Sequence, residues 1–400
     1  MPAGKSKAYD VAVVGAGVFG AWTALTLRKA GASVLLIDAY GTAHARASSG
    51  GESRIIRMGY GPDEIYTRWS LRALPLWLEL FAEADRPELF QRTGVLWIAD
   101  ERERASYAQD TIASLTTLRV PHEKLKVDDL RREYPQITFD DTSWGILEPF
   151  SGVLMARRAI QTVVDQAQKL GMHYKVAAAT PPNPPKSTAA GNTHLQIIET
   201  TTGETISAAQ FVFACGPWLA KLFPALLANR IFVTRAEIFF FGTPPGDTRF
   251  QSPQMPTWLF LRDEFYGMPD LENRGFKVAN DRHGAAVDPD TQSRIATPQA
   301  VAAAQEFVAQ RFPALKNAPI IETRVCQYEN TSNGDFLIDR HPDFENVWLV
   351  GGGSGHGFKH GPSVGEYVAS QVLNIGKLAA TPEPRFSLAT KLSTQHRAIH

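Results

Sequence analysis

The chain has 400 residues, of which 44% are hydrophobic and 20% are charged. This composition supplies enough apolar side chains for a substantial core and excludes a disordered protein, and the length suggests two or three domains. Lys plus Arg and Asp plus Glu both number 41. Because no net charge draws the chain to nucleic acid or to a membrane surface, we expect neither as a partner.

Cysteine usage and targeting signals bear on the compartment. The sequence has two cysteines, Cys215 and Cys326, which do not make a disulfide framework and so favour a reducing compartment. The first seven residues include basic side chains but not the apolar stretch of a secretory signal. No run of about 18 apolar residues is available to span a membrane. We therefore expect a cytoplasmic protein, and we predict no metal site.

The first forty residues indicate a β-strand, an α-helix and a second β-strand. Residues 9–14 and 33–37 are short apolar runs, and residues 21–29 between them favour a helix. Further along the chain we predict helices over 64–84, 105–118, 155–170, 298–310 and 362–373, and strands over 94–99, 210–214 and 347–350.

Two segments have distinctive compositions. Residues 180–192 are rich in Pro, Gly, Ser and Asn, which predicts a surface loop at the tip of a hairpin. Residues 231–287 are rich in strand formers and aromatic side chains. That composition favours a sheet covering an apolar pocket over another strand–helix–strand repeat.

A glycine pattern follows the first strand directly. Gly15, Gly17 and Gly20 form G-x-G-x-x-G at the start of the helix. The first glycine permits a tight turn, the second lets backbone approach a pyrophosphate, and the third allows close helix–strand packing. Asp38, at the end of the second strand, can accept hydrogen bonds from a ribose. The combination predicts a dinucleotide site, and the alternative is a glycine-rich turn that only packs.

The dinucleotide is assigned from two later segments. Residues 211–216 (FVFACG) and 348–353 (WLVGGG) have the pattern of strands that return to the same site. An NAD dehydrogenase completes its nucleotide domain in one contiguous half, whereas this split layout suits the longer FAD molecule. We therefore predict FAD as the cofactor.

The predicted fold class is α/β, with an α+β substrate domain. We expect a Rossmann-like FAD-binding fold interleaved with a β-sheet-rich substrate domain. The FAD-binding domain is predicted over 1–90, 150–225 and 320–400. The substrate or catalytic domain is predicted over 91–149 and 226–319.

Five motifs in order resemble a known family. They are DAY at 38–40, GESRIIR at 51–57, YGMP at 266–269 with GFK at 275–277, RVCQY at 324–328, and GSGHGFK at 353–359. From residue 9 to about 386 the sequence resembles the monomeric sarcosine oxidase family. That family includes N-methyltryptophan, pipecolate and fructosyl amino acid oxidases, within the glycine/D-amino acid oxidase-like superfamily.

The resemblance gives the two cysteines different expectations. In the family, a cysteine in the context of Cys326 is joined through sulfur to the flavin 8α-methyl group, so the resemblance implies covalent FAD. A thiolate is the nucleophile, and a neighbouring cation favours it. The alternative for Cys326 is a small buried hydrophobic residue. Cys215, at a strand end, is expected to be a core residue beside the cofactor.

The resemblance also implies roles for five further residues. Arg57 and Lys359 match the pair that holds the substrate carboxylate, although an ordinary surface ion pair is the alternative for Arg57. Arg54 matches a residue under the flavin ring. Lys277 matches the lysine that activates oxygen by stabilising developing superoxide. The alternative for Lys277 is a solvated lysine at a strand end. His356 begins the loop before a helix whose positive end could face the flavin C2 carbonyl.

Other positions are expected to contact cofactor or substrate. Tyr266 and Tyr328 are predicted at the substrate. The resemblance places the following residues at the cofactor, beside those already named: Val18, Phe19, Ala39, His44, Ser48, Ser49, Val176, Gly216, Trp218, Gly353, Gly355, Gly357 and Phe358, with Arg54, His356 and Lys359.

The sequence departs from sarcosine oxidases at three positions. Asp281 stands where they carry a histidine. At this position the sequence is more similar to fructosyl amino acid oxidases, which carry an acidic residue. Glu329 replaces a small polar residue, and Met58 replaces a histidine. Buried carboxylates are costly unless they meet a cation or a hydroxyl. We therefore hypothesise a substrate larger than sarcosine with additional hydroxyl or amino groups, although a solvated Glu329 is an equal alternative.

The expected reaction is oxidation of a secondary amine or N-substituted amino acid to an imine, which hydrolyses, while O2 is reduced to H2O2. No catalytic base is assigned. Alternatives are a dehydrogenase of the same fold that passes electrons to a carrier, a non-catalytic FAD-binding module, and an NAD dehydrogenase. We expect a monomer.

Overall fold

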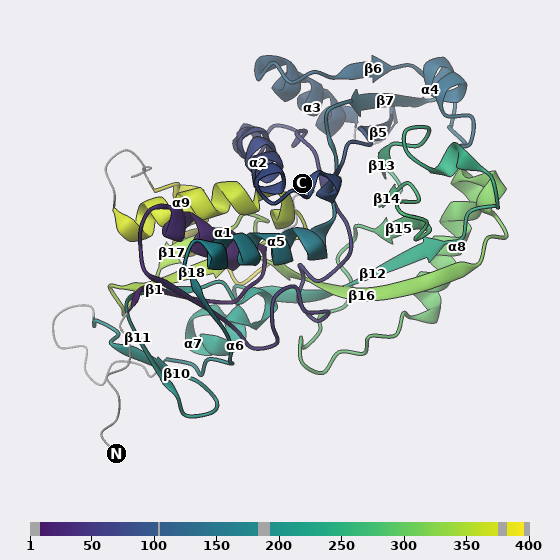
Figure 1. Ribbon diagram of the computed structural model, residues 1–400. Coiled ribbons are helices and arrows are strands. Elements are labelled where there is room, and N and C mark those ends of the chain that lie inside the picture. Colours follow the sequence, from purple (N-terminus) through teal and green to yellow (C-terminus); the bar gives the residue numbers. More distant parts are fainter. Residues whose placement is uncertain (1–8, 103–104, 183–192, 375–381, 396–400) are drawn as a thin grey trace.

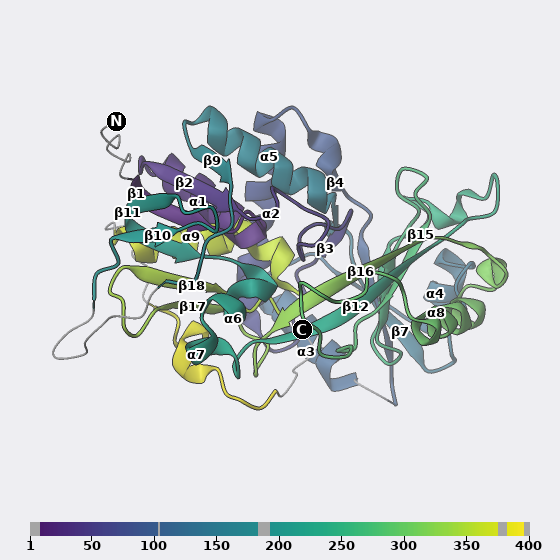
Figure 2. The same ribbon diagram turned by 90° about the horizontal axis from the view of Figure 1, so that it is seen from below.

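The computed structural model describes residues 9–102, 105–182, 193–374 and 382–395. The chain forms two parts, each built around one large sheet, and β12 (Phe232–Phe241) and β16 (Ile320–Asn330) run side by side between them (Figures 1 and 2). Within the described residues, no helix is long and apolar enough to cross a membrane.

The first sheet contains the predicted strand–helix–strand unit. Its order is β17-β18-β11-β1-β2-β9, with β10 on the edge of β11. Strand β1 pairs in parallel with β2 and β11, and β11 pairs in parallel with β18. These strands are buried runs of apolar residues because helices cover the sheet. The bounds are β1 (Tyr9–Val14), β2 (Val34–Asp38), β9 (His173–Val176), β10 (Ile197–Glu199), β11 (Thr205–Phe213), β17 (Leu337–Arg340) and β18 (Val347–Gly351).

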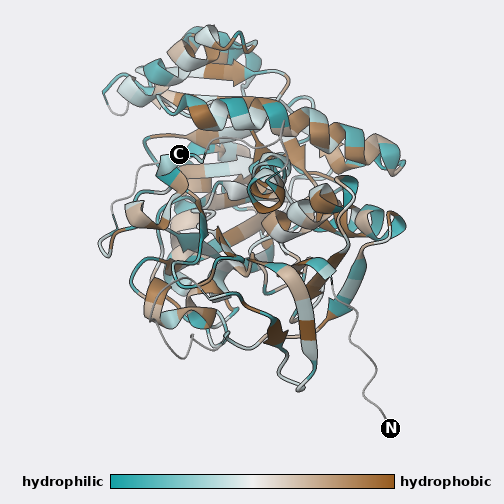
Figure 3. Cartoon of the chain, turned by 90° about the vertical axis from the view of Figure 1, so that its left-hand side faces the viewer, coloured by the Kyte–Doolittle hydropathy of each residue, from teal (hydrophilic) through white to brown (hydrophobic). Residues whose placement is uncertain are grey.

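Four helices pack beside this sheet. Helix α1 (Val18–Lys29) contacts α9 (Gly361–Leu373) and α5 (Ala156–Lys169), and α2 (Glu64–Glu83) contacts α9. The chain enters α1 directly from the glycine turn, so the N-terminus of α1 lies at the carboxyl edge of β1. In Figure 3 the helices show apolar and polar stripes, which is the amphipathic pattern of helices that cover a core.

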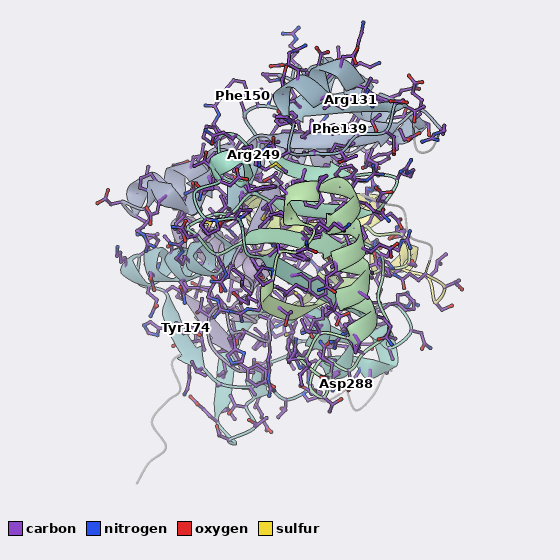
Figure 4. The ribbon with its side chains drawn as sticks, turned by 90° about the vertical axis from the view of Figure 1, so that its right-hand side faces the viewer. Arg131, Phe139, Phe150, Tyr174, Arg249 and Asp288 are labelled. Carbon is purple, nitrogen blue, oxygen red and sulfur yellow. The ribbon has the colours of Figure 1, made fainter. Side chains whose placement is uncertain are left out.

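The second sheet has eight strands in the order β16-β12-β15-β14-β13-β5-β7-β6. The ladder between β12 and β16 runs from the pair Phe232–Asn330 to Phe241–Ile320. Helix α8 (Pro298–Arg311) lies over one face of the sheet (Figure 4). The other strands are β5 (Val95–Asp100), β6 (Glu123–Leu125), β7 (Ser143–Glu148), β13 (Thr257–Phe260), β14 (Phe265–Met268) and β15 (Phe276–Asn280).

Smaller elements complete the described chain. A three-stranded sheet has the order β3-β8-β4, with β3 (Arg54–Ile56), β8 (Gly152–Leu154) and β4 (Phe90–Gln91). The other helices are α3 (Ala105–Thr117), α4 (Val127–Glu133), α6 (Leu219–Leu222) and α7 (Pro224–Leu227), with short 3-10 turns at 87–89, 216–218, 248–250, 313–315, 357–360, 384–386 and 388–390.

The predicted fold class and strand–helix–strand unit are confirmed, and one domain boundary differs from the structure. Residues 320–330 were assigned to the FAD-binding domain, but β16 pairs along its length with β12 of the second sheet. The rest of the domain division stays a prediction. A hairpin tip was expected within 180–192, of which 183–192 lie outside the described residues. In the described part of this region, β10 and β11 form a hairpin whose turn lies at 200–204.

Candidate active site

The carboxyl ends of β1, β2 and β11 meet at a cavity of about 400 Å³. Gly15 has φ +105°, and a Cβ there would lie 2.3 Å from the carbonyl oxygen of Ala214. A Cβ at Gly20 would lie 1.9 Å from the carbonyl oxygen of Gly15, so Gly20 serves helix–strand packing and does not line the cavity. The N-terminus of α1 is held by a hydrogen bond from the Val18 backbone to Ser49 Oγ at 3.0 Å.

Asp38 is fixed at the end of β2 by three backbone donors. One carboxyl oxygen accepts from the Ala16 N–H at 2.7 Å, and the other accepts from Tyr40 at 2.9 Å and Gly41 at 3.0 Å. The carboxylate therefore joins the glycine turn to the segment after β2. A glycine turn before a helix with an acidic residue on the second strand is the arrangement that binds a dinucleotide.

Most residues predicted at the cofactor line this cavity. They are Gly15, Gly17, Val18, Phe19, Asp38, Ala39, His44, Ser48, Ser49, Arg54, Cys215, Gly216, Trp218, Cys326, Gly353, Gly355, Gly357 and Phe358. Val176 is 58% exposed and does not line it, because the chain turns inward only at Ala177 to Ala179. Tyr40, Lys221 and Asp290 line the cavity without having been predicted. FAD fits this lining, which has a glycine turn, a helix N-terminus and a fixed carboxylate.

Cys326 lies beside a cation at one end of the cavity. Nη2 of Arg54 is 3.8 Å from Cys326 Sγ and donates to the carbonyl oxygen of Ser48 at 2.7 Å. Nη1 of Arg54 donates to the carbonyl oxygen of Ser53 at 2.7 Å. These two backbone bonds hold the guanidinium beside the sulfur of Cys326.

The pairing of the second sheet brings four predicted residues to one face. Directly paired residues in a sheet point to the same side, and Lys277 pairs with Phe240 while Cys326 and Tyr328 pair with Ala236 and Thr234 on the same strand. Tyr266 belongs to this face through its pairing with Ala279. The opposite face packs its phenylalanines and Trp258 into the core beneath α8. The aromatic segment is thus divided between core and site.

Lys277 is 3% exposed, so it is not the solvated lysine of the alternative interpretation. Its Nζ donates to the carbonyl oxygen of Ser53 at 3.0 Å and to Ser53 Oγ at 3.2 Å. Burial lowers the pKa of Lys277 well below its usual value, and the nearby Arg54 lowers it further. Within the described residues it forms no ion pair.

Arg57 and Lys359 are both buried and meet at Tyr60, which sequence reasoning missed. Lys359 Nζ donates to Tyr60 Oη at 2.7 Å and to the carbonyl oxygen of His356 at 2.9 Å. The Arg57 guanidinium lies 4.4 Å from the Tyr60 ring centre and 4.5 Å from that of Trp97. Burial lowers the pKa of Lys359, and Arg57 lowers it further. In the sequence, the position of Tyr60 three residues after Arg57 was the signal that could have identified it as a site residue.

Glu148 holds the turn that carries Arg57. Its carboxylate accepts from the Met58 N–H at 2.7 Å, the Gly59 N–H at 3.0 Å, Trp97 Nε1 at 2.8 Å and Ser151 Oγ at 2.6 Å. Four donors satisfy a buried carboxylate without an ion pair. Arg57 is therefore positioned by the backbone around it, and its charge is not neutralised by a salt bridge within the described residues.

Asp281 faces the tyrosine pair of the second sheet. The hydroxyl groups of Tyr266 and Tyr328 are 3.4 Å apart. Burial raises the pKa of both tyrosines, and the charge of Asp281 raises each further. The charge of Asp281 also raises the pKa of Lys359, which partly offsets the lowering of that pKa by burial. These mutual effects indicate that Asp281 shares one region with both tyrosines and Lys359.

Two predicted residues occupy different places from those expected. Glu329 lines the cofactor cavity against the glycine loop after β18 and is 7% exposed, so the solvated alternative is wrong. His356 packs its ring against Phe336, with centroids 4.9 Å apart, and does not line the cavity. Its Nε2 lies 3.1 Å from the carbonyl oxygen of Gly334. His356 reaches the site through its carbonyl oxygen, which accepts from Lys359 Nζ, and through its ring, whose Nδ1 lies 3.4 Å from Tyr60 Oη.

Comparison with known proteins gives a consistent result. The family model described as FAD dependent oxidoreductase matches residues 10–371. The chain is 30% identical over 376 residues to monomeric sarcosine oxidase of Bacillus sp. (strain NS-129), covering 93% of this chain and 94% of that protein. It is also 30% identical over 370 residues to N-methyl-L-tryptophan oxidase of Salmonella heidelberg (strain SL476), covering 91% and 95%.

A solved structure supports the fold. The open form of NikD, described as an unusual amino acid oxidase essential for nikkomycin biosynthesis, has a TM-score of 0.77 at 21% identity, covering 99% of this chain and 100% of that one. The predicted resemblance and the dependence on FAD are thereby confirmed. The chain belongs to the FAD-dependent oxidoreductase family and, within it, is similar to the sarcosine oxidases.

Proposed function

We propose that the protein oxidises the C–N bond of a secondary amine that also bears a carboxylate, yielding an imine that hydrolyses in water. The observation that carries this proposal is the pair of buried cations, Arg57 and Lys359. Neither forms an ion pair within the described residues, and both are only 4% exposed. Two desolvated cations in one region favour an anionic ligand.

The two cations bind the substrate carboxylate in complementary ways. Arg57 offers a planar fork that can donate to two oxygens, whereas Lys359 adds a point charge. Tyr60 contacts both groups, and its hydroxyl keeps Lys359 in place until the substrate arrives. Fixing the carboxylate fixes the amine carbon relative to the cofactor, which is the main contribution that positioning residues make to rate.

FAD, when bound, accepts two electrons from the amine and can pass them to oxygen. Lys277 supports oxygen as the acceptor, because a buried cation stabilises the negative charge of superoxide in a site of low dielectric. The expected products are therefore the imine and H2O2. A dehydrogenase that uses an electron carrier would not need Lys277 in this place.

Covalent attachment of FAD through Cys326 is part of the proposal. It is supported by the position of Cys326 in the cofactor cavity and by Arg54 beside its sulfur. Cys215 lines the same cavity, but burial raises the pKa of its thiol well above the usual value. A thiol that stays protonated is a poor nucleophile, so Cys326 is the proposed attachment site.

The substrate is proposed to be larger than sarcosine. Asp281 supports this, because a carboxylate beside Tyr266 and Tyr328 can accept hydrogen bonds from a hydroxyl or an ammonium group of the substrate. Glu329 no longer contributes to this hypothesis, since it lies at the cofactor cavity. A monomeric state is supported by the similarity to a monomeric sarcosine oxidase, and the cytoplasmic location stays a prediction.

The test is an anaerobic titration of the purified protein with a panel of amines. The panel contains sarcosine, N-methyl amino acids, pipecolate, proline and fructosyl amino acids, together with the matching amines that lack the carboxylate. Loss of the oxidised flavin absorbance with carboxylated amines only, followed by peroxide formation on admitting air, supports the proposal. Reduction by amines regardless of a carboxylate contradicts it. Reduction without peroxide indicates a dehydrogenase, and no reduction by any amine indicates a binding module.

A further inference from the structure

Three carboxyl groups line the cofactor cavity, and they differ in their partners. Asp290 pairs with Lys221. Asp38 accepts three backbone hydrogen bonds. Glu329 is 7% exposed, and its Oε1 has no hydrogen-bond partner within the described residues. A buried polar atom without a partner costs free energy unless a ligand satisfies it. Oε1 packs against the glycine loop and is closed to the cavity, so the rest of the carboxyl group, which no side chain bonds within the described residues, is the part that can contact the occupant of the cavity.

The neighbours of Glu329 identify the elements that surround that contact. Glu329 pairs with Val233 near the end of β16, three residues after Cys326. A Cβ placed on Gly351 would lie 2.4 Å from Glu329 Oε1, so this oxygen packs on the glycine loop after β18. The charge of Glu329 also contributes to the raised pKa of Cys215, at the end of β11. Glu329 thus lies on β16, the strand that carries Cys326, and close to the end of β11 that faces the glycine turn.

Charged groups nearby are engaged elsewhere. Arg54 donates to the backbone of Ser48 and Ser53, and Lys221 of α6 is bound by Asp288 and Asp290. On the neighbouring strand β12, Arg235 pairs with Glu237. Beside Arg54 and Lys221, the titratable groups that line the cavity with Glu329 are Asp38, Tyr40, His44, Cys215, Asp290, Cys326 and Tyr328, and none of them forms an ion pair with Glu329 within the described residues.

The local environment favours the protonated carboxyl group. Burial raises the pKa of Glu329 to about 8, opposed only by the backbone N–H groups of Gly352 and Gly353. FAD carries a pyrophosphate with negative charge, and a second anion in the same desolvated cavity would repel it. A neutral carboxyl group has one O–H donor, which suits the oxygen-rich acceptors of the cofactor.

We propose that Glu329 binds FAD as a neutral carboxylic acid, donating a hydrogen bond to an oxygen of the cofactor, so that FAD binding is coupled to one proton. The proposal rests on the FAD cofactor and is independent of which amine is oxidised. Binding of FAD to protein with ionised Glu329 takes up one proton from solution. No bond to the flavin is made or broken in this step.

The test measures reversible FAD binding in protein carrying Cys326→Ser, which removes the proposed covalent link. Flavin fluorescence gives the dissociation constant between pH 6 and 9.5, with Glu329 intact or replaced in Glu329→Gln. With Glu329 intact, the constant should be flat below about pH 7 and rise towards tenfold per pH unit above about pH 8. The Gln variant, a neutral donor of similar shape, should show no such rise.

Two further measurements keep the outcome decisive. In weakly buffered solution at pH 9, the protein with Glu329 should take up close to one proton for each FAD bound, and the Gln variant should take up none. Glu204→Gln, at an exposed glutamate that pairs with Lys175, is the matched control and should behave as the parent. Equal pH dependence and equal proton uptake with Glu329 and Gln overturn the proposal. A protein that passes these tests but oxidises no amine contradicts only the proposed function.

Discussion

Lys359 donates a hydrogen bond to the hydroxyl of Tyr60 at 2.7 Å, although the two residues are 299 positions apart in the sequence. The same tyrosine ring lies under the guanidinium of Arg57. One side chain thus joins the turn after β3 to the 3-10 turn before α9. The arrangement brings two cations together before any anion is bound, which leads to the first prediction.

Lys359→Met should weaken binding of a carboxylated amine about 10- to 100-fold, because it removes a charge-assisted hydrogen bond. The effect should appear mainly in KM, and it should be much smaller for an amine that lacks the carboxylate. Tyr60→Phe should have a smaller effect in the same direction. Lys175→Met, at a half-exposed lysine that pairs with Glu204, is the control, and steady-state kinetics with matched substrates give the comparison. An equal loss for both kinds of amine would argue against carboxylate binding.

Lys277→Met should slow reoxidation of the flavin by about 10²–10³-fold, the size seen when one group that stabilises developing charge is removed. Reduction of the flavin by the amine should change much less, since Lys277 contacts Ser53 and is not part of the cation pair. Stopped-flow measurements of each half-reaction separate the two effects. If the reduction step alone were slowed, Lys277 would serve the amine rather than oxygen.

Cys326→Ser should release the yellow colour into the supernatant when the protein is precipitated with acid. The parent protein should keep its flavin in the pellet, because a covalent bond survives unfolding. Cys215→Ser is the matched control, since this residue lines the same cavity and its thiol contacts the Val14 carbonyl oxygen at 3.4 Å. Free flavin from the parent would contradict covalent attachment while leaving the FAD site intact.

Glu329→Gln should stabilise the FAD-free protein at pH 7.5 but not at pH 5. The pKa of Glu329 is raised from 4.5 to about 8 on folding, so between these values the folded state holds a proton that the unfolded state has lost. Stability therefore falls as pH rises through this window, by up to about 1.4 kcal/mol per pH unit. Urea unfolding of both proteins at several pH values measures the difference. Parallel curves for the two proteins would show that the carboxyl group does not titrate as described.

Asp281→Ala should change the ranking of the amine panel, reducing activity most with substrates that carry hydroxyl or amino groups beyond the amine. Loss of one hydrogen bond to a charged acceptor corresponds to about 10-fold or more. Asp141→Ala is the control, because the Asp141 side chain is 93% exposed and pairs with Arg131, which Figure 4 labels far from the cavity residues. An unchanged ranking would end the hypothesis of a larger substrate.

The sequence by itself determined the features that depend on neighbouring residues. The glycine pattern with Asp38 predicted the dinucleotide site, since the turn, the helix start and the strand end are all within thirty residues. The strands predicted at 9–14 and 347–350 and the helix predicted from 64 likewise followed from local periodicity, and the structure has them at 9–14, 347–351 and 64–83. Ordered motifs identified the family, and the similarity to sarcosine oxidases agrees with them.

Only the tertiary structure decided which distant side chains meet. Tyr60 gave little signal, because its role depends on Lys359 and Arg57 reaching the same ring. The sequence comparison placed Glu329 at the substrate because it is an acidic departure three residues after Cys326. In the structure, β16 ends beside the glycine loop, and Glu329 therefore lines the cofactor cavity. Strand pairing and burial are set by contacts between residues far apart in sequence, and local pattern carries no information on them.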